Sequence, residues 1–180
     1  SPTIPAFAIP IKVCGDTLAE NNEAFRIALS NVSGAAVQVN TGFATIFDDD
    51  PFDLLLEESG PSPDQAVALD ALLLVRDPFR VQSIPDWFTT GVDRNTRVAF
   101  FVRNLQLTAG ETPASVSVLL FNNNTGLAVF VGAEGIAPVP NTEFTQVVVK
   151  LPSNLTPGTY TVQINAHQRG TNFGTIRIVQ

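Results

Sequence analysis

The second half of the chain is a series of short apolar segments that alternate with polar residues and are separated by turns. Successive side chains of a β-strand point to opposite faces, so this period of two is typical of strands with one buried face. The turns are rich in Gly, Asn and Pro, as at 108–110, 122–126 and 138–141. This spacing predicts an all-β fold and favours a sandwich over an α/β fold. The predicted strands are Thr96–Leu105, Ser115–Phe121, Leu127–Val131, Thr145–Leu151, Tyr160–His167 and Thr175–Val179.

Tyr160, the only tyrosine, follows the turn at 155–159. This arrangement resembles the tyrosine corner of Greek-key sandwiches, in which the hydroxyl bonds back to the backbone near the turn. We therefore expect a structural role for Tyr160. The register of its strand predicts that His167, the sole histidine, lies on the outer face, and that the inward side chains are Tyr160, Val162, Ile164 and Ala166.

The stretch before Arg80 is less regular. Residues 51–63 are acidic and contain prolines, which predicts a linker, with the first strand of the next domain as the alternative. Ser62-Pro63 is a good helix start signal, so we expect a short helical turn from Gln65, then a strand that ends before Asp77-Pro78. The domain after the linker would span residues 64–180.

The first fifty residues predict three strands, at 7–14, 23–30 and 43–47. Acidic residues follow the first strand and the last one. If the strands run up, down and up, both acidic groups lie at the same edge of the sheet. An extra hairpin at 40–42 would instead carry the second group to the opposite end.

These acidic groups are the main candidate site. Residues 1–60 hold nine acids and two basic residues, a balance of −7, which equals the net charge of the whole chain. Adjacent carboxylates repel one another unless a cation lies among them, and Ca2+ prefers oxygen ligands. The sequence therefore predicts a Ca2+ site, with simple solvated charge and a pair of glycosidase acids as alternatives. The candidate ligands are Asp16, Glu20, Glu23, Asp48, Asp49 and Asp50.

The same residues carry a resemblance to a known family. The string from Val13 to Thr17, the acids near Glu23, Leu29-Ser30-Asn31 and the run from Ala44 to Asp50 resemble the second half of a Calx-beta module. The resemblance implies an Ig-like sheet over residues 1–50 and places the six acids at ligand positions. It covers half a module, so we expect an incomplete Ca2+ site. Residues 96–180 are similar, less specifically, to bacterial Ig-like and TIG-type repeats.

A half module leaves an apolar sheet face uncovered. We expect this face to pack on an adjacent domain or on a second copy of the chain as a homodimer. Because the sequence contains no Met, we also expect it to be part of a longer polypeptide. The acidic first third disfavours nucleic acid, and no apolar run approaches the length of a membrane span, so no membrane insertion is expected.

Catalytic signals are weak in this sequence. A single histidine cannot form a His-based metal site, and no Ser or Cys lies in a recognisable nucleophile motif. Cys14 is the only cysteine, which excludes an internal disulfide framework. Trp87 closes a core or, in the alternative, stacks on sugars as part of a carbohydrate-binding module.

Together these features predict a non-enzymatic module of a bacterial secreted or cell-surface protein. Its expected roles are structural spacing and adhesion, with Ca2+ stiffening the junction between domains. The expected partners are adjacent domains, other surface proteins and glycans. An accessory domain of an extracellular enzyme is a further alternative.

Overall fold

The computed structural model describes residues 9–15, 22–34, 36–50, 52–58, 62, 64–82 and 93–180. These residues form an all-β fold, as predicted, and contain no α-helix; a short 3-10 turn, η2, covers Pro113–Ser115. Within the described ranges, no helix is long and apolar enough to cross a membrane. The strands are β1 (Glu23–Ala28), β2 (Thr41–Ile46), β3 (Ala68–Asp70), β4 (Phe79–Arg80), β5 (Arg97–Arg103), β6 (Ser117–Asn122), β7 (Ala128–Pro138), β8 (Phe144–Lys150), β9 (Gly158–Ala166), β10 (Arg169–Gly170) and β11 (Gly174–Val179).

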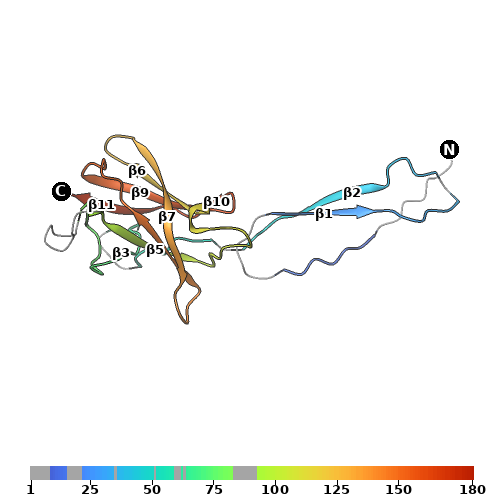
Figure 1. Cartoon of the computed structure of the whole chain (residues 1–180), viewed down its shortest axis with the longest axis horizontal. Helices are drawn as coiled ribbons and strands as arrows, with labels where there is room; N and C mark the ends of the chain where they lie inside the picture. The colour runs from blue at the N-terminus through green and yellow to red at the C-terminus, as the bar shows by residue number, and fades with distance from the viewer. Residues whose placement is uncertain are drawn as a thin grey trace.

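Most of the strands form a sandwich with two layers (Figure 1). The first layer has the order β3-β5-β8-β7 and the second has the order β7-β6-β9-β11-β4. Strand β7 belongs to both, because its first part pairs with β6 and its second part with β8. The change of partner coincides with a β-bulge between Ala133 and Gly135. Bulges bend strands and so allow one strand to pass between packed sheets.

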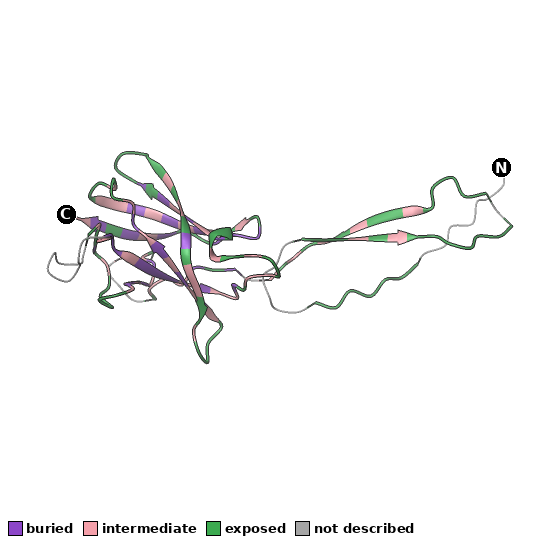
Figure 2. Ribbon diagram, viewed as in Figure 1, coloured by how far each residue is buried: buried purple, intermediate pink, exposed green. Residues whose placement is uncertain are grey.

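The core lies between the two layers (Figure 2). Alternate residues of the facing strands point inward, and their side chains are almost completely buried. Most are β-branched or aromatic, which suits a pleated and closely packed surface. The largest of them include Phe79, Leu54, Phe100, Leu105, Leu120, Leu151, Ile164 and Ile176.

The tyrosine corner is present as predicted. The Tyr160 hydroxyl donates to the Thr156 carbonyl oxygen at 2.8 Å and accepts from the Thr156 amide at 3.2 Å. The inward register of β9 is also confirmed, because the side chains predicted to face inward are buried. The phenol therefore fixes the turn before β9 while its ring fills the core.

Residues 52–57 are part of the sandwich, in agreement with the alternative to a linker. Phe52 and Leu54 are buried in the core. The Leu55 amide donates to the Phe101 carbonyl oxygen at 2.9 Å, so this segment adds to the edge at β5. The segment also approaches β11, where a Cβ on Gly174 would lie 2.9 Å from Cδ2 of Leu56. Only glycine allows this close approach.

Residues 64–75 differ from the predicted helical turn followed by a long strand. Gln65 and Ala66 form isolated β-bridges, and the only strand in this stretch is β3, which ends at Asp70. The chain then reverses in a turn at 71–75. The helix start signal at Ser62-Pro63 is only a local preference. Pairing with Thr175 and Leu56 instead satisfies the backbone groups of Gln65 and Ala66 across the sheet.

Strands β1 and β2 form an antiparallel hairpin that projects from the sandwich (Figure 1). Both were predicted, but the third strand, expected over 7–14, is not formed within its described residues 9–14. Ile9, Ile11 and Val13 are exposed there. Pro10 interrupts the donor pattern of this segment, and nothing in the described hairpin pairs with it.

Candidate functional site

The acidic residues after β2 lie where the hairpin meets the sandwich. The Asp48 amide donates to Oδ1 of Asn22 at 2.9 Å, and Glu23 is paired with Ile46 in the ladder. The start of β1 and the end of β2 are therefore neighbours, so Glu23 lies at the same end of the hairpin as residues 48–50. Asp16 and Glu20 lie outside the described residues, so the convergence of the two acidic groups stays a prediction. The alternative reversal at 40–42 is absent, because β2 starts at Thr41 and continues to Ile46.

Arg169 connects this junction to the sandwich. Its Nη1 forms an ion pair with Oδ2 of Asp48, and its Nη2 donates to the Asp50 carbonyl oxygen at 3.1 Å. The Asp48 side chain is only 7% exposed. A guanidinium can hold two acceptors in one plane, so Arg169 fixes both the position and the direction of the chain after β2.

A tight turn between β9 and β10 places Arg169 at the junction. His167 and Gln168 both have positive φ values, of 51° and 58°. This left-handed conformation is uncommon outside glycine and costs free energy, so the surrounding contacts must hold it. Arg169 then pairs with Ala166 across the turn.

His167 is buried, and the prediction that it lies on the outer face of its strand is wrong. The strand ends at Ala166, and the positive φ of His167 turns its side chain inward. Its Nε2 lies 3.0 Å from Oε2 of Glu111, and its side chain is 2% exposed. Among the described residues, no group forms a hydrogen bond with the buried Nδ1.

Glu111 is held in its charged form by its neighbours. Burial alone would raise its pKa, but hydrogen bonds from Thr108 and His167 outweigh burial and lower the pKa. The Thr108 amide donates to Oε2 of Glu111 at 2.8 Å. This pair therefore anchors the turn that carries Arg169 to the segment at 108–111.

The six predicted metal ligands have different surroundings. Asp16 and Glu20 lie outside the described residues. Glu23 is exposed at the start of β1, Asp49 is exposed, and Asp50 is half-buried. Within the described ranges there is no group of three His, Cys, Asp or Glu side chains that could hold a metal ion. The Asp48 carboxylate is already neutralised by Arg169, so it fits an ion pair better than a cation.

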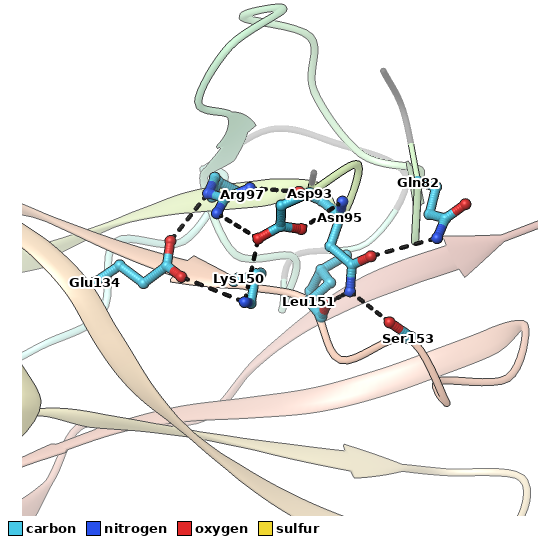
Figure 3. Close-up of polar contacts among 8 residues, drawn as sticks. All are labelled: Gln82, Asp93, Asn95, Arg97, Glu134, Lys150, Leu151 and Ser153. Carbon is cyan, nitrogen blue, oxygen red and sulfur yellow. Dashed lines mark hydrogen bonds and ion pairs between the residues drawn. The ribbon is translucent and has the colours of Figure 1, made fainter. Parts of the chain in front are cut away.

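A second polar cluster lies on the outer face of β5, β7 and β8 (Figure 3). Arg97 contacts Oδ2 of Asp93 at 2.9 Å and Oε2 of Glu134 at 2.9 Å. Lys150 Nζ lies 3.2 Å from the same Asp93 oxygen. The hydrogen bond from Arg97 is the main reason that the pKa of Asp93 is lowered to about 2.

Beside this cluster, Asn95 closes the end of the first layer. Its Nδ2 donates to the Leu151 carbonyl oxygen at 2.7 Å and to Oγ of Ser153 at 2.8 Å, and its Oδ1 accepts from Gln82 (Figure 3). All of these contacts join neighbouring strands or the segments that follow them. The cluster therefore has a structural role.

Trp87, the candidate sugar platform, lies outside the described residues.

Sequence reasoning missed Arg169 as the partner of Asp48. The two residues are 121 positions apart, and no local pattern marks the contact. The only signal was the distribution of charge. Residues 61–180 contain as many basic as acidic residues, whereas residues 1–60 are strongly acidic. In the structure, one basic side chain of the sandwich pairs with an acid from the first third.

Comparison of the chain with protein families, curated proteins and solved structures finds no match. The resemblance to Calx-beta modules and to bacterial Ig-like repeats therefore stays a prediction.

Proposed function

We propose that this chain is a non-enzymatic structural module of a secreted or cell-surface protein. In this proposal the sandwich is a rigid body, the hairpin is an arm for contact with adjacent domains, and Arg169 sets the angle between them. The observation that carries the proposal is the bond from Arg169 to both Asp48 and Asp50 at the junction. A spacer needs a defined angle, and a half-buried bidentate contact supplies one.

The exposed hairpin supports a role in contact with other domains. An isolated two-stranded hairpin is marginally stable in water. Phe43 on β2 is 78% exposed and Phe47, just after the strand, is 73% exposed, so this part of the hairpin carries exposed apolar surface. A further strand or sheet would bury these rings, and we propose that an adjacent domain or a second copy of the chain provides it.

The proposal is tested by the distance between the hairpin and the sandwich. In a Cys14→Ser background, spin labels at Val39→Cys and Leu127→Cys report this distance in the full chain, since both positions are exposed. We expect a narrow distribution that becomes broad in Arg169→Gln. The matched control is Arg177→Gln, which removes the ion pair with Asp77 elsewhere on the sandwich. A parent distribution as broad as that of Arg169→Gln would contradict the proposal.

A role for Ca2+ at the same junction is a second proposal. It is favoured by the placement of Glu23 at the same end of the hairpin as residues 48–50. Because Arg169 already pairs with Asp48, Ca2+ would depend mainly on Asp49, Glu23 and the acids before β1. We expect millimolar Ca2+ to narrow the distance distribution and raise the melting temperature. Both effects should be lost in Asp49→Asn with Asp50→Asn, and no response to Ca2+ would leave the spacer role alone.

A further inference from the structure

The turn between β3 and β4 exposes four large apolar side chains in a row. Leu72, Leu73, Leu74 and Val75 are 61%, 48%, 71% and 51% exposed. We call residues 71–75 the apolar finger. It lies at the end of the sandwich away from the hairpin (Figure 1), and the Ala71 amide at its base donates to the Arg97 carbonyl oxygen at the start of β5. Scattered apolar residues on a surface are ordinary, but four consecutive ones at a protruding tip indicate a contact surface.

The finger is a turn in which the backbone amides of residues 71–74 are satisfied within the chain. Oδ1 of Asp70 accepts from the amides of Leu72 and Leu73, each at 2.9 Å. The Leu74 amide donates to the Asp70 carbonyl oxygen, and the Asp70 amide donates to the Val75 carbonyl oxygen, each at 2.8 Å. With the bond from Ala71, every amide from residue 70 to residue 74 has a partner inside the molecule.

Leu74 has a backbone conformation that is unfavourable for leucine. Its φ is 56°, in the left-handed region that glycine and asparagine occupy most easily. A leucine there costs free energy and gains no burial, since it is the most exposed side chain of the finger. The fold therefore gives up stability to present an apolar side chain at this point.

We propose that the apolar finger inserts into the outer part of a lipid bilayer. Lipid offers no hydrogen-bond partners, so a segment that enters it must satisfy its own backbone groups. The donor half of this requirement is met at residues 71–74, through Asp70 and the Arg97 carbonyl oxygen, whereas a protein pocket can supply partners of its own and does not demand it. The tip also carries no charged residue. Arg76 at its base, whose side chain is 66% exposed and forms an ion pair with Glu57 at 2.6 Å, would remain among headgroups.

The insertion would be shallow, because the finger is one turn long. It is a peripheral contact and not a span, and it departs from the expectation of no membrane insertion that hydropathy and net charge suggested. The chain carries a net charge of −7, so we expect zwitterionic membranes to be bound better than anionic ones.

The test is flotation of the full chain with phosphatidylcholine vesicles, with and without phosphatidylserine. We expect the parent protein to float with the first kind and less with the second. The variant Leu72→Ser with Leu74→Ser should lower the partition coefficient at least tenfold. The matched control, Phe130→Ser, changes a side chain that is 67% exposed on β7 and should leave partitioning unchanged.

A second variant separates insertion from folding. Leu74→Gly relieves the positive φ, so its melting temperature should not fall, while vesicle binding should decrease. A Leu73→Cys variant in the Cys14→Ser background, labelled with an environment-sensitive dye, should shift to shorter wavelength on adding vesicles. Failure of the parent protein to bind either vesicle would overturn the proposal. An equal loss of vesicle binding in Phe130→Ser would also overturn it. So would finger variants that change only self-association or protein binding, because that result would identify a protein contact instead.

Discussion

The hairpin and the sandwich use the same alternating sequence pattern but reach different degrees of burial. In β9 the inward side chains, such as Val162 and Ile164, are completely buried. In β1 the corresponding face, with Phe25 and Ile27, is only half-buried, and Phe43 of β2 is mostly exposed. Periodicity decides which face of a strand is apolar, whereas burial requires a second layer. The stability of the chain therefore resides in the sandwich.

Truncating one phenylalanine in each region gives the largest test of this comparison. Phe100 is fully buried on β5, so Phe100→Ala should lower the free energy of unfolding by about 3–5 kcal/mol through lost burial and a cavity. Phe43→Ala should change it by no more than about 0.5 kcal/mol. Urea denaturation followed by circular dichroism measures both. Similar losses in the two variants would break the comparison.

The tyrosine corner is a device that the sandwich has and the hairpin lacks. Tyr160→Phe keeps the ring but removes both hydrogen bonds with the Thr156 backbone, so we expect a loss of about 1–2 kcal/mol. Thr161→Ala on the outer face, which removes one exposed bond with Asn123, should cost less than about 0.5 kcal/mol. Thermal denaturation measures the loss of stability in both variants. Equal losses would mean that the hydrogen bonds of the tyrosine corner contribute no more than one exposed hydrogen bond.

The boundary between the two regions can be tested through Arg169. Arg169→Gln should change the stability of the sandwich by less than about 1 kcal/mol, because the Arg169 side of the ion pair is 36% exposed. Limited proteolysis should nevertheless cut the chain near residues 48–50 faster than in the parent protein. Arg177→Gln serves as the control, with no acceleration expected. A large loss of global stability in Arg169→Gln would mean that the hairpin and the sandwich fold as one unit.

The smallest expected effect is the pH dependence that Asp93 gives the sandwich. Its pKa is about 2 in the folded chain against an ordinary value of 3.8, so its charged form stabilises the folded state. That contribution is complete above about pH 4 and is lost as pH falls toward 2. Asp93→Asn should therefore show a shallower fall in melting temperature over this range. Parallel curves for parent and variant would contradict the role of the Arg97 contact.

Much of the sandwich was predictable because its strands follow a local pattern, the alternation of apolar and polar residues. The predicted segments at Thr96–Leu105 and Thr175–Val179 differ from β5 and β11 by one or two residues at their ends. Tyr160 was predictable for the same reason, since its turn and its ring are adjacent in sequence. The second part of β7 was missed, because its partner changes at the bulge and the alternation is interrupted by Gly135.

The candidate site was predictable only in part. The acids of 48–50 are a visible run, and the two-strand topology brings Glu23 to the same end. The role of Arg169 could not be inferred, because it depends on how two distant regions dock. His167 shows the same limit, since one residue of positive φ after the strand reverses the direction predicted from alternation.

The passage of β7 from one layer to the other has a consequence for dynamics. A strand that is shared by both sheets cannot detach from one without disturbing its register in the other. The two layers should therefore lose protection against amide hydrogen exchange together, at the rate of global opening, although each has its own set of partners. The change of partner at the bulge between Ala133 and Gly135 should therefore make the sandwich a single cooperative unit.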